Sequence, residues 1–204
     1  MFRAVQLYTF LDYCQDSLLE KQVLECGAGV WRGLEPLLVR FHNLGYATCG
    51  IEISAERLAA ARAYCAEHQI DLDIRQGDMR KLSFADASFS FAFSYNSIFH
   101  MTKADVAVAF GEMSRVLKPQ GICFVNVLSV DDEGFGDGQE VGPGEFLGRE
   151  AGEEVIHSYY EDREADRYFD GMTVLYKEKR ILQRLFQDGE QIRQAYIDYI
   201  VQKE

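Results

Sequence analysis

The sequence has no long hydrophobic run. No stretch approaches the roughly 18 apolar residues that a membrane-spanning helix needs. The chain opens with Met-Phe-Arg-Ala-Val-Gln-Leu-Tyr, which lacks the apolar centre of an export signal. With 48% hydrophobic and 26% charged residues, the composition is that of an ordinary globular protein. We therefore expect a cytoplasmic protein that does not have a membrane as its partner.

Runs of lysine or arginine are also absent. The 21 basic and 33 acidic residues give a formal net charge of −12. Nucleic acids and anionic membrane surfaces are bound through clustered positive charge. The acidic balance therefore argues against both as partners, and it favours a small-molecule ligand.

The sequence contains no Cys-x-x-Cys pair. Its five cysteines are an odd number and are widely scattered. Cys26, Cys49 and Cys123 lie within short apolar stretches, where a free thiol behaves as a small hydrophobic group. This pattern predicts reduced structural cysteines and no disulfide framework.

Strand and helix patterns alternate from about residue 22 to residue 128, within a length that predicts one domain. Two N-terminal caps support the helices: Ser54, and a capping box formed by Thr102 and Asp105. The expected strands are Gln22–Cys26, Ala47–Ile51, Leu72–Gln76, Phe89–Ser94 and Ile122–Leu128, and the expected helices run over about 34–44, 54–68 and 102–117. Such alternation predicts an α/β fold with a doubly wound, mostly parallel sheet.

The pattern changes after Ser129. Glycines and acidic residues dominate from Asp131 to Gly152, and we predict a long mobile loop within residues 129–160. Asp131-Asp132-Glu133 raises the possibility of a metal site. Because no histidine stands at ligand spacing, a solvated loop is the favoured interpretation, and we expect no metal.

Two runs rich in β-branched and aromatic residues close the sequence. They cover Met172–Phe186 and Gln191–Gln202, and they flank Gln187-Asp188-Gly189-Glu190. Asp-Gly between apolar runs is a strong hairpin signal. We therefore expect an antiparallel hairpin over residues 172–202, added to the parallel sheet.

One segment points to a ligand class. Val23-Leu24-Glu25-Cys26-Gly27-Ala28-Gly29 predicts an apolar strand that ends in an acid and a glycine turn. The next strand also ends in an acid, Glu52, where a carboxylate can accept two hydrogen bonds from a ribose diol. Nicotinamide cofactors, flavins and S-adenosylmethionine all remain open at this point. Arg32 occupies the third glycine position of Gly-x-Gly-x-x-Gly, which weighs against a dinucleotide.

Two further segments narrow the ligand class. Gln76-Gly77-Asp78-Met79 places an acid just past the third strand, and residues 112–121 (EMSRVLKPQG) precede the fifth. Together with the glycine turn and Glu52, they make residues 20–128 resemble the class I S-adenosylmethionine-dependent methyltransferases. That resemblance implies a Rossmann-like sheet of seven strands with one strand reversed. It also implies S-adenosylmethionine as cofactor and S-adenosylhomocysteine as product.

The resemblance also implies a role for individual residues. Acidic and backbone groups at the strand ends would hold the cofactor: Glu25, Gly27, Ala28 and Gly29 the methionine moiety, Glu52 the ribose, Ile53, Asp78 and Met79 the adenine, and Ser94 or Tyr95 the ammonium group. Trp31, Ser90 and Gln120 depart from the residues common in the family. None of these departures removes a carboxylate that the cofactor needs.

Methyl transfer from a sulfonium requires alignment and sometimes a base. His100 follows the fourth strand and His157 follows the glycine-rich segment, so both are candidate catalytic residues, with a structural role as the alternative. His42 and His68 lie near helix ends and are expected to be solvated. Four tyrosines are candidates for an aromatic chamber, with core packing or dimer contacts as the alternative: Tyr8, Tyr13, Tyr159 and Tyr160.

The sequence thus predicts a methyltransferase that acts on a small molecule by in-line displacement. A protein substrate and a non-catalytic regulatory protein that binds S-adenosylmethionine are the alternatives, followed by a nicotinamide-dependent oxidoreductase. We also predict that Asp131–Gly152 is a lid, which would close over the cofactor and bring His157 toward the substrate.

Overall fold

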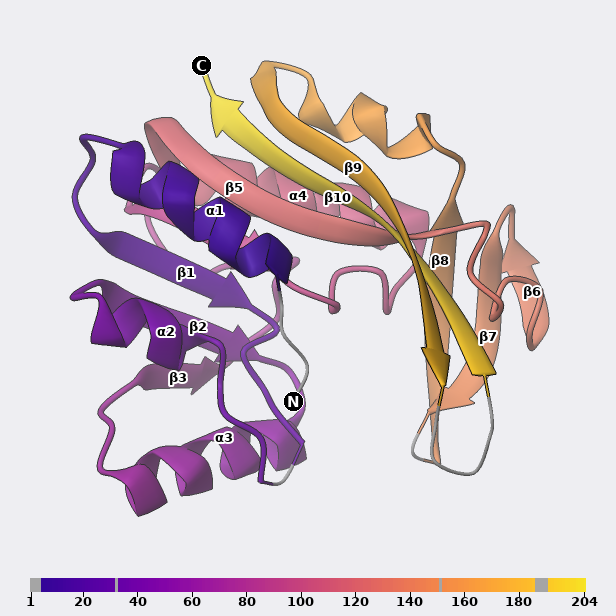
Figure 1. Ribbon diagram of the computed structural model, residues 1–204, viewed down its shortest axis with the longest axis horizontal. Helices are drawn as coiled ribbons and strands as arrows, with labels where there is room; N and C mark the ends of the chain where they lie inside the picture. The colour runs from indigo at the N-terminus through magenta and orange to yellow at the C-terminus, as the bar shows by residue number, and fades with distance from the viewer. Residues whose placement is uncertain (1–4, 32, 151, 186–190) are drawn as a thin grey trace.

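The computed structural model describes residues 5–31, 33–150, 152–185 and 191–204 (Figure 1). Its core sheet has the strand order β3 (Asp73–Gln76), β2 (Ala47–Glu52), β1 (Gln22–Cys26), β4 (Phe89–Ser94), β5 (Leu117–Ser129), β10 (Gln191–Lys203) and β9 (Met172–Leu185). Strands β1 to β5 are parallel, and β10 is antiparallel to both of its neighbours. The predicted α/β fold with a closing antiparallel hairpin is confirmed. The expected turn of that hairpin, and Phe186, lie outside the described residues.

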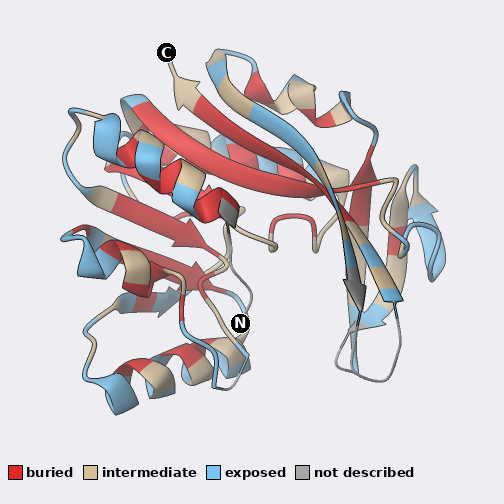
Figure 2. Cartoon of the chain, viewed as in Figure 1, coloured by how far each residue is buried: buried red, intermediate tan, exposed pale blue. Residues whose placement is uncertain are grey.

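Helices cover both faces of this sheet. On one face lie α1 (Val5–Asp16), α2 (Leu38–Asn43) and α3 (Ala55–His68), and on the other lie α4 (Lys103–Val116) and the short 3-10 helix η1 (Glu164–Phe169). The central strands are almost wholly buried between these layers (Figure 2). This arrangement explains why β4 and β5 are continuous apolar runs, since side chains on both of their faces enter a core.

Both predicted helix caps accept a backbone N–H, but the Asp105 carboxylate bonds to Arg80, and the return bond of a capping box is not found among the described residues. Ser54 Oγ accepts the backbone N–H of Arg57 at 3.3 Å, and Thr102 Oγ1 accepts that of Asp105 at 3.1 Å. The helix expected from residue 34 begins only at Leu38, because Pro36 disfavours helical geometry at the residue before it.

The first helix was not expected from the sequence. Leu7, Phe10, Leu11 and Cys14 are buried at helical spacing along α1. The Phe10 ring lies 5.9 to 6.0 Å from the rings of three phenylalanines of the sheet and α2: Phe41, Phe93 and Phe124. The helix therefore contributes to the core beside the central strands.

The prediction of a long loop over 131–152 is wrong. This part of the chain forms β6 (Gln139–Gly142) and β7 (Glu145–Glu150), which pair antiparallel with each other, and β7 pairs with β8 (Glu153–Tyr160). Pro143 and Gly144 form the turn between β6 and β7, and the φ angle of +70° at Gly144 suits glycine. The sequence conceals these strands because their pairing partners, not their composition, stabilise them.

The three added strands join the core sheet at one place. Only the end of β8 pairs with β5, through Leu128 with Tyr159 and Ser129 with Tyr160, among the described residues. All five cysteines are buried free thiols, as expected. Of the helices that the structure describes, none is long and apolar enough to cross a membrane.

Candidate functional site

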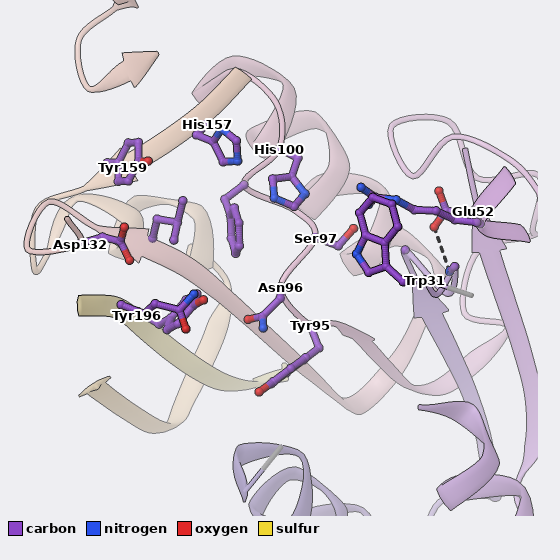
Figure 3. Close-up of a pocket in the computed structure, with 16 residues that line it drawn as sticks. Trp31, Glu52, Tyr95, Asn96, Ser97, His100, Asp132, His157, Tyr159 and Tyr196 are labelled. Carbon is purple, nitrogen blue, oxygen red and sulfur yellow. Dashed lines mark hydrogen bonds between the residues drawn. The ribbon is translucent and has the colours of Figure 1, made fainter. Parts of the chain in front are cut away.

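Two adjoining cavities open at the carboxyl ends of the parallel strands. The main cavity, of about 480 Å³, lies between the glycine turn after β1, the segment after β4, and strands β8 and β10 (Figure 3). The side cavity, of about 130 Å³, lies over β2 and the segment after β3. Gly27, Glu52, Ser97 and His100 line both cavities.

The glycine turn brings the backbone unusually close to its surroundings. Gly27 has a φ angle of +90°, and a Cβ atom there would lie 2.1 Å from Ser97 Oγ. A Cβ atom on Gly29 would lie 2.4 Å from Glu52 Oε2. Because neither position has room for a side chain, the turn exposes bare backbone to the cavity. The amides of Gly27 and Ala28 both donate to the Ile51 carbonyl, each at 2.9 Å, which fixes the turn against β2.

Glu52 connects the turn to α3. Its Oε2 accepts the Gly29 N–H at 2.9 Å, and its Oε1 accepts the Ser54 N–H at 2.7 Å. The side chain is buried, yet it lines both cavities. Each oxygen retains capacity for a further hydrogen bond, so the carboxylate can also accept from a ligand.

Glu25 lies deeper than Glu52. Its carboxyl is buried, and among the described residues nothing bonds to its Oε2. Burial, and then the nearby charge of Glu52, raises the pKa of Glu25 well above its usual range, although the Leu38 backbone N–H acts in the opposite direction. Glu25 lines neither cavity, so the structure places it behind the glycine turn.

The side cavity has an apolar wall and a polar wall. Ile53 and Met79 supply the apolar wall, and Asp78 supplies a carboxylate. Arg80 holds that carboxylate with hydrogen bonds of 2.7 to 3.0 Å, and it also bonds to Asp105 at 3.1 Å. The Arg80 side chain lowers the pKa of Asp78, which keeps this carboxyl ionised.

The structure separates the two residues predicted to meet the ammonium group. Ser94 is fully buried at the end of β4, and no described group bonds to its Oγ. Tyr95 lines the main cavity and stacks on Phe124, with ring centroids 6.0 Å apart. Tyr95 is therefore the one of the pair that a ligand in this cavity can reach.

The two candidate catalytic histidines meet in the main cavity. His100 and His157 are far apart in sequence, yet their ring centroids are 4.9 Å apart and their planes are nearly perpendicular (Figure 3). Burial, with smaller contributions from the charges of His157 and Arg57, lowers the pKa of His100 to about 3. His100 is therefore neutral at physiological pH. His42 and His68 are exposed and do not line the cavity.

The four tyrosines named from the sequence have different surroundings. Tyr159 lines the main cavity, and Tyr160 is buried in the core beside it. Tyr8 is half exposed, with the Arg40 guanidinium 5.0 Å from its ring centroid. Tyr13 donates to the Leu175 carbonyl at the opposite end of the sheet.

Several cavity residues were not expected from the sequence. They come from the segments after β4 and β5 and from the first half of β10: Asn96, Asp132, Gln194 and Tyr196. Asn96 and Asp132 follow strands at the ligand-binding edge, which is a signal that the sequence carries. Gln194 and Tyr196 reach this edge because β10 runs antiparallel to β5, so its beginning lies where β5 ends.

The three adjacent acids are held by three different partners. Asp131 pairs with Lys179, Asp132 accepts the Ala195 N–H, and Glu133 accepts the Arg193 N–H. Within the described ranges, no group of three or more histidine, cysteine or acidic residues is arranged to hold a metal ion. These bonds also fix the base of the segment predicted to be a lid, and its closure on a ligand remains a prediction.

Comparison with known proteins gives a family match. A family model described as a methyltransferase domain matches residues 24–125, which is half of the chain. The putative methyltransferase YqeM of Bacillus subtilis (strain 168) is 32% identical over 108 residues. These cover 52% of this chain but only 41% of that protein.

Solved structures show the same fold. A SAM-dependent methyltransferase from Methanosarcina mazei superposes with a TM-score of 0.72 at 18% identity, covering 100% of this chain and 98% of its own. The 1,6-didemethyltoxoflavin-N1-methyltransferase of Burkholderia thailandensis, solved with 1,6-didemethyltoxoflavin and S-adenosylhomocysteine, gives a TM-score of 0.63 at 15% identity. That match covers 98% of this chain and 75% of the other.

Proposed function

We propose that this chain, which belongs to the methyltransferase-domain family, binds S-adenosylmethionine and transfers its methyl group to a small molecule. The family match confirms the resemblance that the sequence predicts, and it covers the glycine turn, Glu52 and Asp78. One observation carries the proposal. The glycine turn and the Glu52 carboxylate meet at the wall that the two cavities share.

The residues at this wall fit the parts of an adenosyl cofactor. The side cavity offers Ile53 and Met79 to a flat ring and the Asp78 carboxylate to an amino group. Glu52, between the cavities, suits a ribose diol. Gly27 and Gly29 leave backbone exposed where a side chain would collide with Ser97 or Glu52. The methionine moiety would therefore extend from Glu52 into the main cavity.

Bound S-adenosylmethionine would supply a methyl group that its sulfonium already activates. The chain's own residues would align the acceptor and exclude water. Trp31, Tyr95 and Phe99 line the main cavity and restrict the space beside the glycine turn. Alignment of two reactants can lower a barrier by about 7–11 kcal/mol. Positioning of the acceptor would therefore supply a contribution of that size to the catalysis that we propose.

The two histidines have different proposed roles. His100, neutral because its pKa is lowered to about 3, suits a hydrogen-bonding role toward the acceptor and is a weak base. His157 lies against it and is less buried in β8 than its neighbours Ser158 and Tyr159. We assign proton acceptance to His157, from where a proton can pass to solvent.

The size of the main cavity supports a small acceptor. Pockets for small molecules typically measure about 300–1,000 Å³, and this cavity measures about 480 Å³. Its far wall is formed by side chains of β8 and β10. A folded protein segment would need an open groove instead.

Incubation of the protein with a cell extract and methyl-labelled S-adenosylmethionine tests the proposal. We expect label in the small-molecule fraction above the background that the extract gives when the protein is omitted. Label in the protein fraction would identify a protein methyltransferase. Binding of S-adenosylhomocysteine without any transfer of label would identify a regulatory protein instead.

A further inference from the structure

The main cavity has two chemically different ends (Figure 3). At one end lie Trp31 and Glu52, with the Arg57 guanidinium 4.4 Å from the Trp31 ring. At the other end lie Asp132, Tyr159 and Tyr196, and the two histidines and Asn96 stand between the ends. The first end belongs to the proposed cofactor site. The second end is the space left for the methyl acceptor.

Asp132 carries a fixed negative charge at the acceptor end. Its Oδ2 accepts the Ala195 N–H at 2.8 Å, and its Oδ1 accepts the Gly134 N–H at 3.0 Å. These neutral donors orient the carboxylate without cancelling its charge. Lys179 and Arg193 pair with the neighbouring Asp131, and no ion pair to Asp132 occurs within the described part of the chain. The charge therefore remains to be balanced at the cavity wall.

Gln194 adds an unsatisfied acceptor to the same end. Its side-chain Oε1 is buried, and no group in the described part of the chain donates to it. The residue lines the cavity from β10, two positions before Tyr196. A buried acceptor without a hydrogen-bond partner is energetically unfavourable. A ligand that donates a hydrogen bond here would recover that cost.

Aromatic rings complete this end of the cavity. Tyr159 packs edge-on against Phe135 and Phe146, with ring centroids 5.6 and 5.9 Å away, which holds its ring in place. A Cβ atom on Gly134 would lie 2.8 Å from Tyr159 Oη and 3.2 Å from Asp132 Oδ1, so the phenol and the carboxylate are neighbours.

Arg180 also lies close to the acceptor end, but its charge is already balanced. The Arg180 guanidinium lies 4.8 Å from the centroid of the Tyr196 ring. It is paired with the buried Asp198 through hydrogen bonds of 2.9 and 3.2 Å. Arg180 therefore does not neutralise the charge of Asp132.

We infer that the methyl acceptor is an amine, and that its ammonium group is bound between the Asp132 carboxylate, Gln194 Oε1 and the rings of Tyr159 and Tyr196. This inference rests on the proposed function. A carboxylate, an amide oxygen and aromatic faces all attract a cationic donor, and aromatic faces are a recurrent means of holding ammonium ions. An anionic acceptor would meet the uncompensated charge of Asp132 at this end.

The reaction of an amine is balanced without a further reagent. The bound ammonium first gives one proton to the His157 imidazole, which releases it to solvent. The nitrogen lone pair then forms a bond to the methyl carbon while the carbon–sulfur bond breaks. The electron pair of that bond stays on sulfur, so the products are S-adenosylhomocysteine and an N-methylammonium.

Three probes of similar shape and different charge test the inference on the protein saturated with S-adenosylhomocysteine. They are phenethylamine, 2-phenylethanol and 3-phenylpropionate, and calorimetry gives the affinity of each. We expect the amine to bind about tenfold more tightly than the alcohol, and the carboxylate to bind most weakly. Equal binding of amine and alcohol, tighter binding of the carboxylate, or no binding of the amine would overturn the inference.

Variants of the protein test which residues bind the ammonium group. Asp132→Asn should reduce amine affinity about tenfold and leave alcohol affinity unchanged, whereas Asp131→Asn, its matched neighbour, should change neither. Gln194→Leu, which leaves the backbone bonds of Asp132 intact, should also weaken the amine selectively. Equal effects of the two aspartate variants would place the ammonium elsewhere. Failure of the unmodified protein to bind S-adenosylhomocysteine would instead refute the proposed function.

Discussion

Asn126, buried on β5, fixes both polar groups of Asn96 that face it. Its Oδ1 accepts the Asn96 backbone N–H at 2.7 Å, and its Nδ2 donates to Asn96 Oδ1 at 2.5 Å. Asn96 has a φ angle of +50°, an uncommon conformation for a residue other than glycine. The pair therefore secures the segment after β4 that lines the main cavity, and it leaves the Asn96 Nδ2 group to face away from Asn126.

We predict that Asn126→Leu lowers the free energy of unfolding by about 2–4 kcal/mol, because it leaves the backbone N–H and the side-chain Oδ1 of Asn96 without partners. It should also weaken S-adenosylhomocysteine binding, since Asn96 and Ser97 line the cavity. Urea denaturation and calorimetry measure the two effects. Ser90→Ala is the matched control, because Ser90 is equally buried and no described group bonds to its Oγ. A similar loss of unfolding free energy and of S-adenosylhomocysteine affinity in both variants would show that the asparagine pair has no special role.

Glu52→Ala should weaken binding of S-adenosylhomocysteine about tenfold or more, because hydrogen bonds to a charged acceptor contribute about 1.5–3 kcal/mol. The substitution also removes the acceptor for the Gly29 and Ser54 amides, so the glycine turn loses its orientation. Glu56→Ala, on the exposed surface of α3, is the control. Unchanged affinity in a folded Glu52→Ala protein would remove Glu52 from the cofactor site.

Asp78→Ala tests whether the Asp78 carboxylate recognises the amino group of adenine. We expect it to lower affinity for S-adenosylhomocysteine about tenfold, and to have little effect on the inosine analogue. Asp105→Ala is the control, since Asp105 also bonds to Arg80 but does not line the side cavity. If both ligands weaken equally, Asp78 acts only by holding Arg80.

His100 should remain neutral in the folded protein throughout about pH 5–8. Its pKa falls from 6.5 in the unfolded chain to about 3 in the folded one. Between these values the unfolded chain binds a proton that the folded protein does not. The contribution of His100 to the free energy of unfolding is therefore complete above pH 6.5. It is lost as the pH falls toward 3, by at most about 1.4 kcal/mol per pH unit.

The imidazole resonances of the protein, followed by NMR as the pH is lowered, check this prediction. The resonance that disappears in His100→Gln should not shift above about pH 5. The variant should also show a weaker dependence of unfolding free energy on pH. A midpoint near 6.5 for that resonance would show that His100 is solvated in solution.

Gln120→Gly should stabilise the protein by about 0.5–1 kcal/mol. Gln120 has a φ angle of +62°, which strains any residue with a side chain, and its carbonyl bond from Gln202 does not depend on its own side chain. Gly121, the next residue, is a control in which a side chain should have the opposite effect on stability. A Cβ atom on Gly121 would lie 2.7 Å from the Lys118 carbonyl oxygen and 3.0 Å from that of Ser90, so Gly121→Ala should destabilise. Thermal denaturation of the two variants measures both effects.

The features of the fold that the sequence predicts are local ones. Strands β1 and β4 have the expected limits, because an apolar run bounded by turn residues specifies a buried strand. Ser54 and Thr102 mark their helices through bonds to residues three positions away. Strands β6 to β8 depend instead on partners brought together by the fold, and their glycines and acids conceal the pairing.

The candidate site is likewise predictable from the sequence only in part. The glycine turn and Glu52 stand at recognisable positions after two strands, so the cofactor end of the cavity can be proposed from the sequence. The acceptor end is assembled from β5, β8 and β10, which meet only because β10 enters the sheet in reverse. No local pattern relates Asp132 to Gln194 or Tyr159, although each follows from the sheet order once it is known.

The narrow junction between β5 and β8 has an evolutionary consequence. Among the described residues, β6, β7 and β8 pair with the core sheet only through Leu128 with Tyr159 and Ser129 with Tyr160. Strands β6 and β7 and the first half of β8 can therefore diverge without disturbing the register of the parallel strands. The proposed cofactor site and part of the proposed acceptor end would then be encoded in separate stretches of the gene, although Gln194 and Tyr196 come from β10. Replacement of residues 139–156, which leaves Asp132 and His157 in place, should therefore alter the surroundings of the proposed acceptor end without altering the proposed cofactor site.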